Sequence, residues 1–144
     1  MDTTTRSCSV ALGQTSLVAA AGGHLATGAL GEELAAGHLQ QRHGLTIVAR
    51  NWRLATGELR GELDLVALDA GSRELIVCEV KTRRNAGRFG GAVAAVSPRK
   101  RAQVRRLTAA YLREGATQHR QVRLDVIAVD LGEVATLTHL AAAL

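Results

Sequence analysis

Four consecutive apolar residues, Leu75 to Cys78, lie within the stretch ELIVCEVK, which has the composition of a β-strand. An apolar run without alternation is typical of a strand that is covered on both faces. The preceding stretch GELDLVAL, at 61–68, is also strand-like, and only residues 69–73 separate the two, which is short enough for an antiparallel hairpin. We therefore expect a hairpin inside a sheet that carries other elements on both sides.

The other segments can supply that cover. Leucine and alanine recur at helical spacing over residues 25–42, and a second helix is expected between Ser97 and Gly115. Further strands are expected at 45–54 and 122–131, with 135–140 as a candidate for one more. This order predicts a single α/β domain over residues 25–144, with a mixed central sheet flanked by helices. Residues 1–24 are expected to form a poorly ordered extension.

The second helix has clear end signals and two distinct faces. Ser97 is a suitable N-cap, proline follows at the first helical position, and Gly115 ends the helix. Val104, Leu107 and Tyr111 are expected to form its buried stripe. On the next strand, Arg123 and Asp125 share a face and are interpreted as a structural ion pair.

Composition excludes several classes of protein. Of 144 residues, 47% are hydrophobic and 22% are charged, as in an ordinary globular domain. Trp52, Phe89 and Tyr111 are the only aromatic residues, which argues against binding single strands on a row of stacked bases. The sequence has no heptad repeat, no Gly-X-Y period and no apolar segment of about 20 residues, so coiled-coil, collagen and membrane-spanning structures are not expected.

The positive charge is concentrated in one part of the chain. The formal net charge is +5, and residues 80–113 contain ten basic residues and no acidic one. They are Lys81, Arg83, Arg84, Arg88, Arg99, Lys100, Arg101, Arg105, Arg106 and Arg113. Such a block favours a polyanionic partner, nucleic acid before membrane, and a solvated helix face is the alternative.

Cysteine and histidine show no metal-binding spacing. Cys8 lies in a polar segment and Cys78 in an apolar one, so no disulfide is expected between them, and the protein is predicted to be reduced and cytoplasmic. The five histidines do not follow a zinc pattern. His38, His43, His119 and His139 are expected to be scattered over the surface.

The hairpin brings two acidic residues together if Leu68 pairs with Leu75. In that register Asp64 lies opposite Glu79, with Cβ atoms about 5 Å apart. A slip of one residue would place them on opposite faces. Lys81 shares a strand face with Glu79, because side chains alternate along a strand.

Two facing carboxylates in an apolar hairpin repel each other and are costly to desolvate. A divalent cation between them removes both problems, and oxygen ligands favour Mg²⁺ or Mn²⁺ over zinc. A nearby lysine can orient water or stabilise developing charge, so the set suits phosphodiester hydrolysis. The alternative is an exposed Glu79–Lys81 ion pair with Asp64 as an ordinary surface residue.

Ordered motifs over residues 25–130 extend this interpretation. They include GALGEELAAGHL (28–39), VARNWR (48–53), GELDLVA (61–67), CEVKTR (78–83) and FGGAVAAVSPRKRAQVRRL (89–107). Together they resemble the YraN-like family of small bacterial proteins. That family is similar to the PD-(D/E)xK, or restriction-endonuclease-like, superfamily near the Holliday-junction resolvases.

The resemblance implies a restriction-endonuclease-like domain whose site consists of Glu32, Asp64, Glu79 and Lys81. By this resemblance, Glu32, Asp64 and Glu79 hold Mg²⁺ or Mn²⁺ and Lys81 positions the attacking water. Leu63 stands where the superfamily has a proline before the aspartate. The basic residues Arg83, Arg84, Arg88, Arg99, Lys100, Arg101, Arg105 and Arg106 are expected to contact phosphates.

Three functions are compatible with these features. The first is a metal-dependent endonuclease that acts on DNA rather than RNA, with branched DNA as one candidate substrate, and that pairs into a homodimer as resolvase-like relatives do. The second is a non-catalytic nucleic-acid-binding module with the same fold. The third is a structural or interaction protein that binds no nucleic acid.

Overall fold

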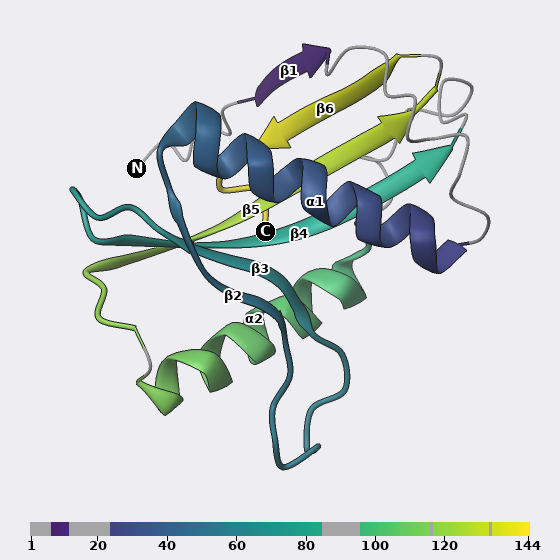
Figure 1. Cartoon of the computed structure of the whole chain (residues 1–144). Helices are drawn as coiled ribbons and strands as arrows, with labels where there is room; N and C mark the ends of the chain where they lie inside the picture. The colour runs from purple at the N-terminus through teal and green to yellow at the C-terminus, as the bar shows by residue number, and fades with distance from the viewer. Residues whose placement is uncertain (1–6, 12–23, 85–95, 116, 133) are drawn as a thin grey trace.

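The computed structural model describes residues 7–11, 24–84, 96–115, 117–132 and 134–144, which form one sheet and two helices (Figure 1). In chain order the elements are β1 (Ser7–Ala11), α1 (His24–His43), β2 (Thr46–Trp52), β3 (Leu63–Leu68), β4 (Glu74–Arg84), α2 (Pro98–Glu114), β5 (Gln121–Leu131) and β6 (Ala135–Leu140).

The sheet is mixed. Its strands lie in the order β1-β6-β5-β4-β3-β2, and β4 pairs with β5 in parallel whereas the other neighbouring pairs are antiparallel. Parallel neighbours need a long crossover, and α2 lies in the connection between β4 and β5. The predicted α/β architecture with a mixed sheet flanked by helices is confirmed.

The two helices cover opposite faces of the sheet (Figure 1). Leu39 of α1 packs in one buried cluster with Ile76, and Leu107 of α2 packs in another with Val77. Because Ile76 and Val77 are neighbours on β4, this central strand is buried on both sides. The apolar run at 75–78 is therefore explained as predicted.

The hairpin of β3 and β4 has the predicted register. Leu68 pairs with Leu75, and the described ladder continues to the pair Leu65 and Cys78. The short connection at 69–73 favours this register, in which Leu65 and Ala67 face α1 and Val66 faces α2.

The end signals of α2 also function as predicted. The Ser97 hydroxyl accepts a hydrogen bond from the Lys100 backbone N–H at 3.1 Å. Gly115 has φ = 66°, a left-handed conformation that glycine adopts without steric cost, and it ends the helix. The predicted buried stripe is present, and Tyr111 packs edge-on against Trp52 with ring centroids 5.3 Å apart.

One strand lies where the sequence indicated only an extension. Residues Ser7–Ala11 form β1, which pairs with β6 from Ser7 opposite Leu140 to Ala11 opposite Thr136. Five residues of such mixed polarity carry little strand signal of their own, and their pairing depends on the presence of β6. The rest of the expected extension, 1–6 and 12–23, lies outside the described residues.

Two other expectations about individual residues hold. Arg123 binds both carboxylate oxygens of Asp125, at 2.8 and 2.9 Å, which confirms the structural ion pair. Cys8 and Cys78 are both free thiols. Neither described helix combines the length and the apolar character that a bilayer crossing needs.

Candidate functional site

The candidate site lies where β3 and β4 stop pairing. Beyond the pair Leu65 and Cys78, the described part of β4 continues to Arg84 in contact with β5. There the Asp64 carboxylate replaces the missing strand partner, because its Oδ2 accepts a hydrogen bond from the Val80 N–H at 2.8 Å. Asp64 and Glu79 therefore stand at the fork between the two strands.

The pKa of the Asp64 carboxyl is strongly raised. The residue is 8% exposed, and burial together with the charge of Glu79 raises the pKa of its carboxyl to about 8. Glu32 adds to this rise, and the hydrogen bond from the Val80 N–H opposes it. Without a cation, Asp64 is therefore largely protonated at neutral pH, and a bound divalent cation would favour its charged form.

Glu32 reaches this fork from α1. Glu62, which directly precedes β3 and was not among the predicted site residues, lies beside it. One carboxylate oxygen from each of Glu32, Glu62 and Asp64 lies within 4.8 Å of the others. The Asn51 amide donates to Glu32 at 3.0 Å and to Glu62 at 3.2 Å, and so holds these two carboxylates in place. Glu62 could have been found, because residues two apart on a strand share a face and Glu62 precedes Asp64 by two.

The three oxygen donors fit a hard divalent cation. Mg²⁺ and Mn²⁺ bind carboxylate oxygens and retain waters, whereas zinc favours nitrogen and sulfur. Arg53 pairs with Glu62 at 2.9 Å, so one member of the group is already partly neutralised. The residues at the fork are therefore chemically suited to one such ion.

Glu79 has a different partner. It is 4% exposed and forms an ion pair with Lys100 of α2, with 3.2 Å between Nζ and Oε1. The sequence assigned Lys100 to phosphate contact, which stays a prediction, and it did not indicate that the Lys100 ammonium also pairs with a buried carboxylate. This ion pair links α2 to the fork and places the Lys100 ammonium beside Glu79, which is itself next to Asp64.

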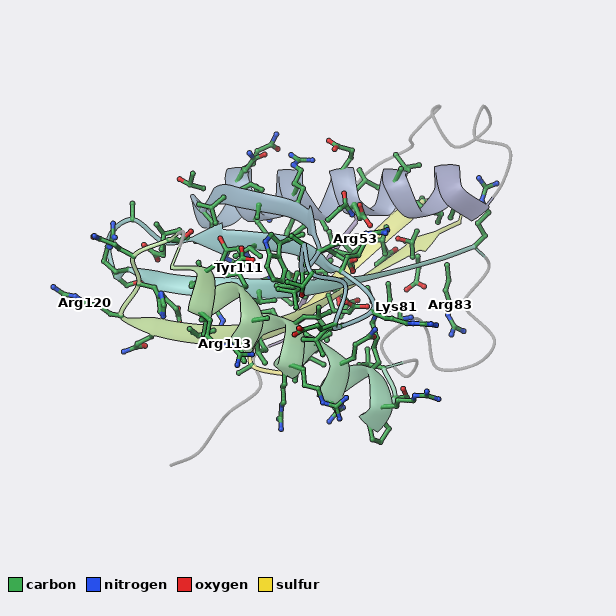
Figure 2. The ribbon with its side chains drawn as sticks, turned by 90° about the horizontal axis from the view of Figure 1, so that it is seen from below. Arg53, Lys81, Arg83, Tyr111, Arg113 and Arg120 are labelled. Carbon is green, nitrogen blue, oxygen red and sulfur yellow. The ribbon has the colours of Figure 1, made fainter. Side chains whose placement is uncertain are left out.

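Lys81 lies on the same side of β4 as Glu79. Neighbouring Val77 faces α2 whereas Cys78 and Val80 face α1, so alternation turns Glu79 and Lys81 toward the α2 side. Lys81 is half-buried and, within the described part of the chain, forms no ion pair. Its ammonium is therefore available beside the fork (Figure 2).

The basic residues form a surface next to this fork. Arg83 and Arg84 are exposed at the end of β4, and the Arg84 Nε donates to Thr27 Oγ1 at 3.1 Å. Arg99, Arg101, Arg105 and Arg106 are exposed on α2, and Arg88 lies outside the described residues. In Figure 2 Lys81 and Arg83 lie on the right of the view, and Arg113 and Arg120 lie on the left.

A pocket of about 480 Å³ lies between α2 and the connection of β2 to β3. Its cationic lining consists of Arg60, Arg99, Lys100 and Arg106. The Gln103 amide donates to the Arg60 carbonyl at 2.8 Å, which ties the connecting loop to α2. Because Lys100 also reaches Glu79, the pocket adjoins the acidic fork.

The expectation for the histidines was wrong for three of them. His38 and His139 are buried, and His43 lies beside them with ring centroids 4.8 Å from His38 and 5.1 Å from His139. Contacts between residues about a hundred positions apart leave no spacing pattern in the sequence. His119 remains separate and contacts the Thr117 carbonyl.

The fold and the fork define a single α/β domain that joins a carboxylate cluster to a basic helix. A family model described as "Uncharacterised protein family UPF0102" matches residues 31–129. The chain belongs to this family, the YraN-like family that its motifs predicted, and the PD-(D/E)xK placement is consistent with that membership.

Bacterial relatives agree. A UPF0102 protein of Acidothermus cellulolyticus is 47% identical over 114 residues, which cover 72% of this chain and 80% of the relative. A UPF0102 protein of Mycobacterium sp. strain JLS is 44% identical over 117 residues, which cover 80% of this chain and 82% of the relative.

Proposed function

We propose that this protein is an endonuclease that uses Mg²⁺ or Mn²⁺ to hydrolyse phosphodiester bonds in DNA. The observation that carries the proposal is the buried Asp64 carboxyl at the fork, with Glu32, Glu62 and Glu79 around it and cationic side chains beside it. Such a group of acids is unfavourable without a counter-charge, and a divalent ion supplies one.

In this proposal Glu32, Asp64 and Glu79 hold the cation, with Glu62 as a further oxygen ligand. The ion would polarise the scissile phosphate and lower the pKa of a bound water. Lys81 would orient that water and stabilise the charge that develops on phosphorus. The water oxygen would form the new bond to phosphorus while the bond to the leaving oxygen breaks. The water would release one proton to solvent, and the leaving oxygen would take one up from solvent.

The basic surface would hold the substrate by its backbone. Arg83 and Arg84 at the end of β4 and Arg99, Lys100, Arg101, Arg105 and Arg106 on α2 would contact phosphates without reading sequence, and Arg88 is proposed to do the same. DNA is favoured over RNA by the resemblance to resolvases, which also makes branched DNA and a homodimer the forms to test first.

A second candidate is a non-catalytic nucleic-acid-binding module with the same fold. The ion pair of Lys100 with Glu79 favours it, because this contact neutralises one carboxylate without a metal. Protonation of Asp64 would neutralise a second. In that case the fork is an internally balanced structural feature, and binding needs no divalent ion.

The test is incubation with labelled single-stranded, duplex, flap and four-way-junction DNA in Mg²⁺, Mn²⁺ or EDTA. We expect cleavage by the wild type in either metal and none in EDTA. Asp64→Asn and Lys81→Ala should abolish cleavage and keep the fold and most of the DNA affinity. Glu114→Gln, an exposed acid at the far end of α2, is the matched control and should cleave like the wild type.

The outcomes separate the two candidates. Equal cleavage by the wild type and both site variants would place the activity elsewhere or in a contaminant, and the proposal would be wrong. Salt-sensitive DNA binding that is independent of metal, with no cleavage of any substrate, would establish the binding module instead.

A further inference from the structure

Four side chains that metals prefer converge at the C-terminal end of α1. Cys8 comes from β1, His38 and His43 from the last turns of α1, and His139 from β6, and one ligand atom of each lies within 4.8 Å of the others. His43 follows Glu32 on α1 by eleven residues, or about 16 Å along the helix axis, so this cluster is separate from the acidic fork.

The backbone brings these residues together without any adjustment of loops. Cys8 lies directly opposite His139 in the pairing of β1 with β6. In Figure 1 the C-terminal end of α1 lies at the end of the sheet where β1 begins and β6 finishes. Three regular elements therefore fix the positions of the four ligands.

The nitrogen atoms are spaced as in a metal coordination sphere. His38 Nε2 lies 3.1 Å from His139 Nδ1 and 3.2 Å from His43 Nε2. Two nitrogen ligands of a tetrahedral zinc ion, each about 2.0–2.1 Å from the metal, are about 3.3 Å apart. The two measured separations are within a few tenths of an ångström of this value.

Hydrogen bonds alone do not satisfy this arrangement. His139 Nε2 lies 2.8 Å from Asp125 Oδ2, and in a neutral His139 ring this contact places the proton on Nε2 and leaves Nδ1 with a lone pair facing His38. His38 Nε2 carries at most one proton and has two nitrogen neighbours. A single proton cannot make two good hydrogen bonds, so at least one lone pair in the group lacks a donor.

Apart from these imidazoles, the described residues offer the His38 ring no hydrogen-bond partner. The ring is 5% exposed, and among the described residues its Nδ1 is left without a partner. A buried polar ring whose contacts are other imidazoles calls for an explanation, and a cation that accepts all the lone pairs provides one.

The residues behind His139 complete the expected surroundings of a metal ligand. A ligating histidine commonly donates its other ring N–H to a carboxylate, which fixes the tautomer and strengthens the ligand. Asp125 fills this place and is itself held by Arg123 and by the Ala142 N–H at 2.9 Å. His139 is thus oriented with Nδ1 toward the cluster.

We propose that Cys8, His38, His43 and His139 form a binding site for a zinc ion, tetrahedral and structural. Nitrogen and sulfur donors select zinc over Mg²⁺, and four protein ligands leave no position for substrate. The Cys8 thiol loses its proton to solvent when the zinc–sulfur bond forms. The ion would fasten β1 to α1 and β6.

The experiment uses the full chain without an affinity tag, cleared of metal by a chelator. Zn²⁺ titration followed by calorimetry should give one site per chain in the presence of excess Mg²⁺. Co²⁺ should give the intense d–d absorption of a tetrahedral centre together with a thiolate-to-cobalt charge-transfer band. Cys8→Ser should remove the charge-transfer band.

Cys8 and His43 are exposed, so their substitution should leave the fold intact. Cys8→Ser and His43→Gln should each weaken Zn²⁺ binding by roughly 10–100-fold or more. Loss of a residue that only supports a ligand already costs a factor of about this size, and these variants remove a ligand itself. His119→Gln, which removes a histidine outside the cluster, is the matched control and should bind Zn²⁺ like the wild type. Circular dichroism and thermal melting of the metal-free variants check that they are folded.

Three results would overturn the proposal. They are the absence of a stoichiometric site in the wild type, unchanged Zn²⁺ affinity in both Cys8→Ser and His43→Gln, and loss of the site in Asp64→Asn. The last would show that Zn²⁺ had bound the carboxylates of the fork. Because Asp64→Asn should keep its zinc site whether or not the wild type cuts DNA, this test is independent of the proposed nuclease activity.

Discussion

Asp64 combines a structural contact with an unfavourable charge. Its carboxyl receives the Val80 N–H where β3 ends its pairing with β4, so it holds the fork in shape. The same position buries it beside Glu79, which makes ionisation costly. Whatever binds at the fork therefore acts on the protonation state of this one group.

This leads to a pH dependence of stability in the metal-free protein. Between about pH 4 and pH 8, Asp64 is protonated in the folded chain and ionised in the unfolded chain, so the folded state holds more protons. The Asp64 contribution to the free energy of unfolding should therefore fall as the pH rises through this window. Urea unfolding of the wild type and of Asp64→Asn in EDTA, at intervals from pH 5 to 8, measures it as the difference between the two.

His38 titrates in the opposite direction and is common to both proteins, so it cancels in this comparison. The asparagine variant should gain stability relative to the wild type as the pH rises. A difference that stays constant from pH 5 to 8 would contradict the raised pKa of Asp64.

Sequence reasoning at single residues succeeded where contacts are local. The register of one hairpin was enough to place Asp64 near Glu79, because only five residues connect the strands. The ion pair of Lys100 with Glu79 was not predicted, because nothing in the sequence shows how α2 lies over β4. The pairing of His38 with His139 joins residues 101 positions apart, and no periodicity encodes such a contact.

The helix α2 connects the recognition surface to the acidic fork. Its N-terminus is fixed by Ser97, whose hydroxyl accepts from the Lys100 N–H, and Lys100 in turn reaches Glu79. The same helix presents Arg99 and Arg106 to the pocket. Its first turn therefore determines how these cations lie relative to the carboxylates.

Loss of the cap should have a measurable effect. Ser97→Ala removes the acceptor of the Lys100 N–H and should lower the free energy of unfolding by about 1 kcal/mol. Ser97→Asp keeps an acceptor and adds a negative charge at the positive end of the helix dipole, so it should match or exceed the wild type. Chemical denaturation of the three proteins at pH 7 compares them, and an aspartate variant as weak as the alanine variant would contradict the capping role.

The elements were predictable to the extent that each has its own signal. Both ends of α2 were marked by Ser97, Pro98 and Gly115, and β6 was found with the bounds 135–140. The strand β1 was missed because five residues of mixed polarity become a strand only when β6 is beside them. Tertiary pairing, and not local propensity, forms it.

The whole molecule has cations at both ends, but only one end adjoins the fork. Figure 2 places Lys81 and Arg83 away from Arg113 and Arg120. A pair of arginine substitutions beside the fork and a pair at the opposite end change the net charge by the same amount. Comparing the two pairs therefore separates local contact with the ligand from overall electrostatic attraction. This design suits any nucleic-acid ligand that the protein binds.

Arg99→Gln combined with Arg106→Gln should reduce the salt dependence of duplex binding. The slope of log affinity against log salt concentration should fall in magnitude by about 0.9 for each phosphate that the variant no longer neutralises, or about 1.8 in total. Arg113→Gln combined with Arg120→Gln is the control and should leave the slope close to that of the wild type. Fluorescence anisotropy over a salt series gives the slopes, and equal changes in both double variants would show that the basic surface has no specific location.

The outer position of β1 and β6 has a practical consequence for the rest of the sheet. A chain trimmed to the family-matched residues 31–129 would begin inside α1 and would lack both strands. The backbone of β5 would then present unpaired N–H and C=O groups beside the apolar residues Ile127 and Val129. Exposed strands of this kind recruit other copies by strand addition, so the trimmed chain should self-associate, and the outer strands protect the molecule from aggregation.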